Sequence, residues 1–295
     1  MKKVAFIINP FSGVGKKSSL VRRLEGIFHP QNGWLAVFHY TTGPNDAFET
    51  SLRYREELYD LVVAVGGDGT VNQVACALLH SPVPMGIIPA GSGNGLARHL
   101  HIPLSVTKAI EVLTQMNIST IDSGEINGQP FFCTAGVGFD ASLANRFNKL
   151  STRGFASYLI ASVKEFVQYR AKKYTLTIDN QTFDYHAFLI TFANCSQWGN
   201  NIMIAPSADE KDGLLDMVVW KNKSKFSILL TATRLLFRRI DRSSHIKNFC
   251  GTSFTLIREQ EGWVHFDGEH TWMGKTIHIG SCPTALKMVT PCLCQ

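Results

Sequence analysis

Short apolar runs alternate with helical patterns from Met1 to about Ser119. The runs that predict strands are KVAFIINP, WLAVFHYTT, LVVAVGG and MGIIPAGS. The segments between them that predict helices are Ser18–Phe28, Ala47–Leu58, Thr70–Leu79, one from about Asn94 and one near Ser105–Met116. Strands that are apolar along their whole length are buried on both faces, as in a parallel sheet covered by helices. The first part of the chain therefore predicts an α/β domain.

The pattern changes after Ser119 to strands joined by tight turns. One predicted hairpin turns at Asn127-Gly128 and a second at Asp179-Asn180, and such pairs strongly favour hairpin turns. Further predicted strands are LLDMVVWK, FTLIRE, WVHFDGE and TIHIGS, with helices over Ser157–Lys172 and Lys225–Arg239.

These patterns predict an α/β plus all-β protein. An N-terminal domain with a parallel sheet covers 1–121, and an antiparallel β-rich domain covers 122–283. The final ALKMVT is expected to return to the first domain, which then also includes about 284–295. A chain of 295 residues fits two domains.

Composition does little to narrow the functional class of the protein. The formal charge of +6 and the pI near 8.9 suit a polyanionic ligand or an anionic membrane, but many other enzymes share them. The seven cysteines include no CxxC pair and suit neither a disulfide framework nor a zinc site. The opening MKKVAFIINPFSG fits a buried strand better than a signal sequence, and no segment has transmembrane length, so we expect a cytoplasmic protein. The terminal CLCQ formally matches a prenylation box at Cys292, but a short tail is the favoured interpretation.

The loop GGDGT, from Gly66 to Thr70, lies between a predicted buried strand and a predicted helix. Its glycines let the backbone approach a ligand, and the helix N-terminus attracts anions such as phosphates. An aspartate beside phosphates is repulsive unless a cation lies between them, so Asp68 suggests Mg²⁺ or a Mg²⁺-bound water. Asp68 could equally cap the helix, and this loop alone does not decide between the two roles.

Two further turns support a phosphate site. IIPAGSGNGLARHL repeats the strand, glycine loop and helix, and the first strand ends in NPFSG. All three turns follow strands of one predicted parallel sheet, so they are expected to form a crevice rich in backbone donors. PFSGVGKKS fails the Walker A pattern. GVGFDA matches a dinucleotide fingerprint, but it lies in the β-rich half and lacks the expected acidic residue.

The motifs NPFSG, GGDGT, PAGSGNGLAR, GVGFDA, SADEKDGLLD and FDGE, in this order, resemble the diacylglycerol kinase catalytic-domain family, which includes sphingosine and ceramide kinases. The resemblance implies an ATP- and Mg²⁺-dependent lipid kinase whose C-terminal domain is a β-sandwich, with catalysis in the cleft between the domains. It also implies a set of nucleotide-binding residues: Asn9, Pro10, Ser12, Gly13, Thr41, Gly66, Gly67, Asp68, Gly69, Thr70, Asn72, Gly91, Ser92 and Asn94.

The resemblance also assigns catalytic and metal residues. Glu269 is the candidate acceptor of the proton of the lipid hydroxyl, with Asp267 near the metal and Asp68 at the Mg²⁺–phosphate end of ATP. Which of Asp267 and Glu269 is the base stays open; on a regular strand both would face one side, unless Gly268 turns the chain. A second metal site would use Asp209, Asp212 and the Leu214 carbonyl, although Lys211 lies inside this cluster.

The implied partner is a lipid substrate at a membrane surface, met through transient peripheral contact. Lysine and arginine clusters could attract anionic headgroups; they lie at Lys16-Lys17, Lys149 with Arg153, and Lys221, Lys223 and Lys225. The segment KFSILLTATRLLFRRIDR is more typical of a core-facing helix than of a membrane-binding one. No motif indicates nucleic-acid binding, and a homodimer is an open alternative to a monomer.

Two other function classes are weighed against the lipid kinase. NAD kinases and phosphofructokinases share a GGDG turn, but PAGSGNGLAR does not resemble the motifs that follow it in those enzymes. A non-catalytic lipid- or nucleotide-binding protein would be expected to have lost Asp68, Asp267 or Glu269, and all three are present. The lipid that accepts the phosphate is not determined by the sequence.

Overall fold

The structure is a computed structural model that describes residues 1–13, 17–148, 166, 168–178, 181–199, 202–221, 224–236, 240 and 243–292. The chain folds into two compact units. Unit 1 comprises Met1–Asp122, Gly199–Asn201 and Pro283–Gln295, and unit 2 comprises Ser123–Trp198 and Ile202–Cys282. The strands β5 (Ile118–Ile126) and β17 (Thr276–Val289) each contribute residues to both units.

Unit 1 contains a parallel sheet. Its strands are β1 (Lys2–Ile8), β2 (Trp34–Tyr40), β3 (Leu61–Gly66) and β4 (Met85–Pro89), in the spatial order β4-β3-β1-β2. The end of β17 lies parallel to β4, with Met288 opposite Met85. The predicted ALKMVT strand is therefore present, but as the continuation of the strand that begins at Thr276.

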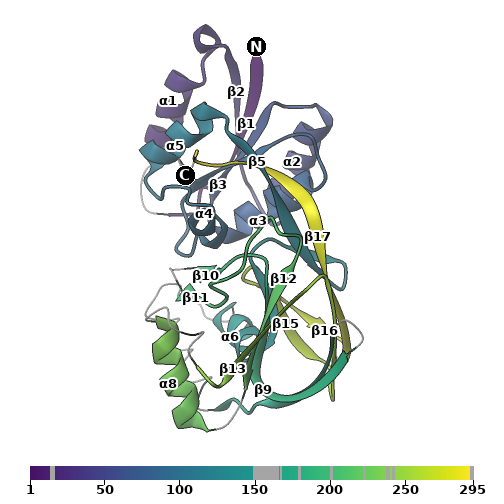
Figure 1. Cartoon of the computed structure of the whole chain (residues 1–295). Coiled ribbons are helices and arrows are strands. Elements are labelled where there is room, and N and C mark those ends of the chain that lie inside the picture. Colours follow the sequence, from purple (N-terminus) through teal and green to yellow (C-terminus); the bar gives the residue numbers. More distant parts are fainter. Residues whose placement is uncertain are drawn as a thin grey trace. The chain divides into compact units, whose positions relative to one another are not determined.

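The helices of unit 1 cover both faces of this sheet (Figure 1). On one face, α1 (Lys17–Ile27) and α5 (Val106–Gln115) pack against the side chains of the central strands. The other face is covered by α2 (Asp46–Glu56) and α3 (Asp68–Leu78), which also contact each other. A 3₁₀ turn (Pro30–Asn32) and the short helix α4 (Gly95–His99) complete the unit. The five helices predicted here are confirmed.

Unit 2 is an antiparallel β-sandwich. Its strands, besides β5 and β17, are β6 (Gln129–Phe131), β7 (Thr134–Gly138), β8 (Lys172–Ile178), β9 (Gln181–Ala193), β12 (Leu215–Lys221), β13 (Ile246–Gly251), β14 (Ser253–Arg258), β15 (Gly262–Phe266) and β16 (Glu269–Met273). The order is β16-β15-β7-β9-β8-β14-β17, and β12 pairs with both β9 and β13. A two-stranded pair of β10 (Gln197–Gly199) and β11 (Ile202–Met203) lies apart from this sheet.

Both predicted hairpins form, with one difference in extent. β5 and β6 turn at Asn127 and Gly128, which have φ of 47° and 80° as a type I′ turn requires. The second strand ends at Phe131, and the rest of the predicted strand is β7, which pairs with β9 and β15. β8 and β9 also pair antiparallel, and their predicted turn at 179–180 lies outside the described residues.

Two helices pack in unit 2. α6 (Phe139–Asn148) follows β7 directly and was not predicted, as β13 was not. α8 (Lys225–Leu236) confirms the described part of the helix predicted over Lys225–Arg239. Most of the helix predicted over Ser157–Lys172 lies outside the described residues, and Lys172 itself begins β8. Within the described part of the chain, no helix combines the length and apolarity needed to cross a bilayer.

Candidate active site

Three loops of unit 1 interlock where β1, β3 and β4 end. The Ala90 N–H donates to the Gly66 carbonyl at 2.7 Å, and the Asn9 N–H donates to the Val65 carbonyl at 3.0 Å. The Asn9 side-chain amide donates to the Thr70 hydroxyl at 3.2 Å. The carboxyl ends of parallel strands meet at one sheet edge, where α/β proteins bind ligands. The three motifs that the sequence places at strand ends therefore lie together.

Asp68 ties the second loop to the third. Its Oδ1 accepts the Gly95 N–H at 2.7 Å, and its Oδ2 accepts the Asn94 N–H at 3.0 Å. Asp68 is also the first residue of α3, so its carboxylate lies at the N-terminus of its own helix and binds N–H groups at the start of α4. A negative charge is favourable at both places. Asp68 thus caps a helix, but that helix is α4 rather than its own.

Several glycines of these loops are required by the loops themselves. A Cβ on Gly91 would overlap the Gly67 Cα, and a Cβ on Gly66 would overlap the Thr70 side chain. A Cβ on Gly13, which has φ of 71°, would lie 2.7 Å from the Ala90 carbonyl oxygen. Only glycine lets backbones approach this closely. Close packing of one loop on another therefore explains these residues before any ligand is considered.

The N-terminus of α3 keeps its backbone donors available. Gly67 is the N-cap residue, no side chain caps the helix, and the first helical bond runs from the Val71 N–H to the Gly67 carbonyl at 3.0 Å. The N–H groups of Asp68, Gly69 and Thr70 have no partner among the described residues. Such a group of donors, reinforced by the helix dipole, binds anions.

The other predicted nucleotide residues border this region in different ways. The Ser12 hydroxyl donates to the Asn9 carbonyl at 2.9 Å, whereas Ser92 is exposed. Asn94, at φ of 52°, uses its side chain to bind both the N–H and the carbonyl of Gly91. Asn72 accepts the Cys76 thiol proton at 3.5 Å on α3. Asn94 and Asn72 thus have local structural partners, and Ser92 leaves its hydroxyl accessible.

Thr41 lies at the end of β2, where a partly buried network fixes the chain. Its N–H donates to the Ile8 carbonyl at 2.9 Å. Next to it, the Asp46 carboxylate accepts the Thr42 N–H at 2.6 Å and the hydroxyls of Thr42 and Thr50, and contacts His39 Nε2 at 3.0 Å. Burial acts to raise the pKa of Asp46, but these hydrogen bonds outweigh it and lower the pKa to about 2.

In unit 2, Asp267 and Glu269 do not lie on one strand. β15 and β16 form a hairpin whose turn is Asp267 and Gly268, with φ of 47° and 88°. Of the two alternatives that the sequence left open, the structure shows the one in which Gly268 turns the chain, so the two carboxylates do not share the face of one strand. Glu269 is exposed at the start of β16.

The Asp267 carboxylate holds the loop before β7. Its Oδ2 accepts the Phe132 N–H at 2.7 Å, and its Oδ1 accepts the N–H groups of Cys133 and Thr134 at 2.8 and 3.1 Å. The Asp267 N–H in turn donates to the Thr134 carbonyl at 2.9 Å. Three N–H donors to one carboxylate are charge-assisted bonds that fix a loop firmly. Asp267 therefore has a structural task in unit 2.

The predicted second metal site is an exposed turn. Asp209 Oδ1 accepts the Lys211 N–H, and Asp212 Oδ1 accepts the Leu214 N–H, both at 2.9 Å. The other oxygen of each carboxylate has no partner in the described part of the chain. Lys211 Nζ lies 3.6 Å from the carboxylate of Glu210 and so pairs with a residue outside the proposed ligand set. Two carboxylate oxygens and a carbonyl are the hard donors that Mg²⁺ prefers.

Sequence reasoning did not single out a buried acid–histidine pair. His265 Nε2, on β15, lies 2.8 Å from Asp140 Oδ2, which also accepts the Thr191 hydroxyl at 3.2 Å. Both side chains are largely buried, and the facing strand carries Gly136 opposite His265, where a Cβ would contact both groups. Asp140 lies in GVGFDA and His265 two residues before Asp267. Because Asp140 and His265 lie 125 positions apart in the sequence, no local pattern indicates that they are in contact.

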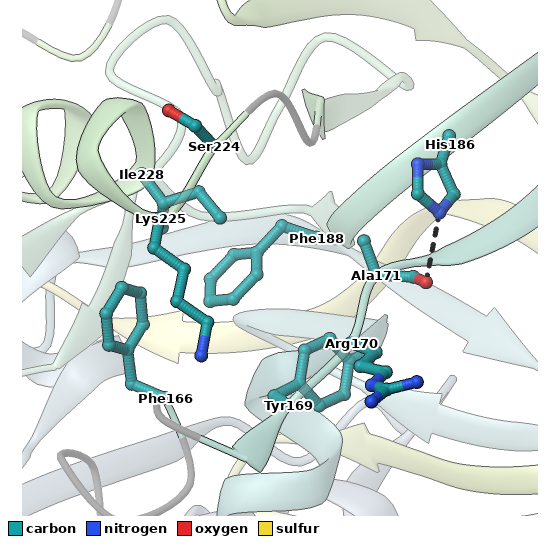
Figure 2. A pocket seen from close by; sticks show the side chains of 9 residues that line it. All are labelled: Phe166, Tyr169, Arg170, Ala171, His186, Phe188, Ser224, Lys225 and Ile228. Atoms are coloured by element: carbon teal, nitrogen blue, oxygen red, sulfur yellow. Dashed lines mark hydrogen bonds between the residues drawn. The ribbon is translucent and has the colours of Figure 1, made fainter.

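Unit 2 also contains a pocket of about 420 Å³ (Figure 2). Aromatic and aliphatic side chains, from Phe166, Tyr169, Phe188 and Ile228, form much of its wall. Lys225, from the start of α8, extends along the pocket toward Tyr169 in Figure 2. Polar and basic residues complete the lining: Arg170, His186 and Ser224, with Ala171. An apolar wall with a few cations suits an amphiphile.

Comparisons with known proteins cover nearly the whole chain. Residues 3–126 match the model of the diacylglycerol kinase catalytic domain, and residues 133–290 match the model of the YegS C-terminal NAD kinase beta sandwich-like domain. A protein of Mycobacterium tuberculosis (strain CDC 1551 / Oshkosh) named diacylglycerol kinase is 31% identical over 291 residues, which are 95% of this chain and 85% of that protein.

Other relatives agree with this assignment. The diacylglycerol kinase of Bacillus subtilis (strain 168) is 28% identical over 284 residues, covering 92% of this chain and 91% of the relative. A crystal structure of a diacylglycerol kinase from Bacillus anthracis shares the fold, with a TM-score of 0.75 at 20% identity over 99% of this chain and 97% of that one. Two consecutive family models and a relative above 30% identity leave one conclusion. The chain belongs to the diacylglycerol kinase catalytic-domain family.

Proposed function

We propose that this chain is an ATP-dependent lipid kinase, which transfers the γ-phosphoryl group of ATP to the hydroxyl of a diacylglycerol or a sphingoid-type lipid. The observation that carries the proposal is the meeting of three loops at one sheet edge, beside the available N–H groups at the start of α3. Backbone donors at a helix N-terminus suit the phosphates of a nucleotide. Family membership supports the reaction type.

The nucleotide would lie along the interlocked loops. Its phosphates would accept hydrogen bonds from the N–H groups of Asp68, Gly69 and Thr70, and the accessible Ser92 hydroxyl would add a further donor. The loops are held in place by Asp68, so the donors are positioned before ATP binds. Positioning of this kind supplies much of the catalysis in phosphoryl transfer.

The donor set fits Mg²⁺ at two places. At the phosphates, Asp68 uses one lone pair of each carboxylate oxygen for an N–H group, which leaves further lone pairs for a metal-bound water. At the 209–214 turn, Asp209 and Asp212 would bind the metal through their remaining oxygens, with the Leu214 carbonyl. Bound Mg²⁺ would neutralise the charge of the phosphates at the first place and brace the turn at the second.

Glu269 is the proposed acceptor of the lipid hydroxyl proton. Its carboxylate is exposed and has no side-chain partner among the described residues, so it can approach a substrate. Asp267 is engaged by three N–H groups, and we assign it the positioning of the loop before β7. The pocket of unit 2 would hold an acyl or alkyl chain of the lipid against Phe166, Tyr169 and Phe188 (Figure 2).

The test is transfer of radiolabelled phosphate from ATP to a panel of acceptors in mixed micelles. The panel contains diacylglycerol, monoacylglycerol, sphingosine and ceramide, with NAD as the soluble acceptor of the alternative kinase class. We expect labelled lipid and unlabelled NAD. Labelled NAD alone, or no labelled product, would refute the proposal.

Variants at Glu269 and Asp68 test the proton acceptor and the nucleotide site separately. Glu269→Gln removes the proton acceptor without breaking a side-chain hydrogen bond to a described residue, so kcat should fall while the free energy of unfolding stays unchanged. The matched control is Glu259→Gln, at another exposed glutamate, which should be fully active. Asp68→Asn keeps one oxygen for the loop bonds and should weaken nucleotide binding measured by calorimetry with ADP and Mg²⁺. Full activity of Glu269→Gln would remove Glu269 from the mechanism.

A further inference from the structure

α8 carries apolar side chains on two opposite faces. Ile228 and Leu235 are buried in the core against β9 and β12, as expected for a core-facing helix. The opposite face presents Phe226, Leu229 and Leu230, which are 77%, 56% and 47% exposed. Their i, i+3, i+4 spacing makes one continuous stripe. Isolated exposed apolar residues are ordinary, but a contiguous stripe marks an interaction site.

The outer stripe is not needed to hold the helix. Ser224 and Ser227 form a reciprocal cap, in which each hydroxyl accepts the backbone N–H of the other at 3.2 and 3.1 Å. Further along, the buried Thr231 hydroxyl contacts the Ser243 hydroxyl at 3.1 Å. Caps and inner-face packing account for the position of α8. The three exposed side chains are therefore available for a partner.

The charges of the described residues in this segment indicate which partner the stripe fits. From 221 to 247 these residues include four lysines and arginines, at positions 221, 225, 234 and 247, and no acidic residue. α8 itself has no acidic residue in its sequence. An apolar stripe within a cationic segment is complementary to an anionic bilayer, where the apolar side chains enter the boundary between headgroups and acyl chains. A protein partner of ordinary composition would not require so one-sided a charge.

We propose that the outer face of α8, formed by Phe226, Leu229 and Leu230, docks this protein on an anionic lipid bilayer. The same helix lines the pocket with Lys225 and Ile228, so one element borders both the docking face and the pocket. A lipid leaving the bilayer at α8 then has a short path to that pocket. The link to a lipid acceptor rests on the proposed function, whereas the docking itself does not.

Co-sedimentation of the full chain with vesicles, in the absence of nucleotide, tests the docking face. Vesicles of phosphatidylcholine alone are compared with vesicles that contain equal parts of phosphatidylcholine and phosphatidylglycerol. We expect stronger binding to the anionic vesicles and weaker binding as salt rises. The variant with serine at all three stripe positions should bind at least about tenfold more weakly, which is less than full burial of three such side chains would give.

A matched control replaces three exposed leucines of unit 1 by serine: Leu35, Leu58 and Leu104. This control should bind vesicles as the unaltered chain does, and thermal unfolding should show that both variants fold. Equal vesicle binding by the α8 variant would overturn the proposal. So would a fall in self-association of the α8 variant, measured by size-exclusion chromatography, with vesicle binding unchanged, since a second copy would then cover the stripe.

The outcome is separable from that of the kinase assay. Vesicle binding that depends on the stripe, in a protein that phosphorylates no lipid, would support the docking face and refute the proposed reaction. Lipid phosphorylation in micelles, together with vesicle binding that does not depend on the stripe, would support the proposed reaction and refute the docking face.

Discussion

Replacing Asp267 distinguishes a structural role from a chemical one. The carboxylate accepts three backbone N–H groups, from Phe132, Cys133 and Thr134, and joins the β15–β16 turn to the loop before β7. Asp267→Ala removes all three acceptors and places alanine at φ of 47°. Asp267→Asn keeps one acceptor oxygen, and asparagine tolerates the left-handed backbone conformation of this position. The two variants therefore remove different shares of one interaction.

The expected loss of stability follows from these contacts. Hydrogen bonds to a charged group contribute about 1.5–3 kcal/mol each when well buried. Asp267 is half-buried, so water competes and about 1 kcal/mol each is the reasonable figure. The left-handed conformation costs alanine about 1 kcal/mol more. Asp267→Ala should thus lose about 4 kcal/mol and Asp267→Asn about half of that. For a unit of this size the alanine variant should melt about 10 °C lower.

Urea unfolding followed by circular dichroism measures both variants, with Glu269→Gln as a control that should unfold like the unaltered chain. Kinase activity is measured in parallel at a temperature where all three are folded. If Asp267→Ala loses activity while its free energy of unfolding stays within about 0.5 kcal/mol of the original, the three hydrogen bonds do not carry the stability assigned to them. Asp267 would then act in the chemistry.

Three other predictions concern stability and loop packing. Asp46, with a pKa of about 2, stabilises the fold above about pH 4 and loses this effect as pH falls toward 2; urea titrations should show that Asp46→Asn lowers stability at neutral pH and flattens this acid dependence. Gly91→Ala should separate the loops at Gly67 and weaken ADP binding in calorimetry at least about tenfold, whereas Gly26→Ala, with open space in α1, should bind normally and be slightly more stable. Arg258 donates to four backbone carbonyls at the open end of the β15–β16 hairpin, so Arg258→Met should lower the free energy of unfolding by about 3 kcal/mol, measured in urea.

The elements that the sequence predicts best are those with an unambiguous local pattern. The strand over Leu61–Gly66 is a continuous apolar run, and the Asn127-Gly128 turn has the residues that a type I′ turn demands. Both patterns are local, so they can be interpreted without knowledge of the rest of the fold. The parallel sheet of unit 1 follows from such runs, and so does the placement of the three glycine loops at its edge.

The parts that could not be predicted depend on contacts between distant segments. Asp140 meets His265 across 125 positions, and neither lies in a pattern that marks a pair. α6 begins at Phe139, directly after β7, and the sequence analysis predicted no helix there. The reason for glycine at position 91 is the backbone at position 67, which only the fold reveals. Local chemistry cannot indicate a partner that the chain brings from elsewhere.

The two aspartates of the motifs GGDGT and FDGE share a physical role that affects how variants of this family are interpreted. Asp68 binds two N–H groups at the start of α4, and Asp267 binds three N–H groups just before and at the start of β7. A carboxylate is the best acceptor for several converging N–H groups, so each residue can be essential to loop position without touching substrate. Loss of activity on alanine substitution therefore does not assign either aspartate to catalysis. Glu269 makes no such bonds to the described residues, and its isosteric variant is the cleaner probe of the chemical step.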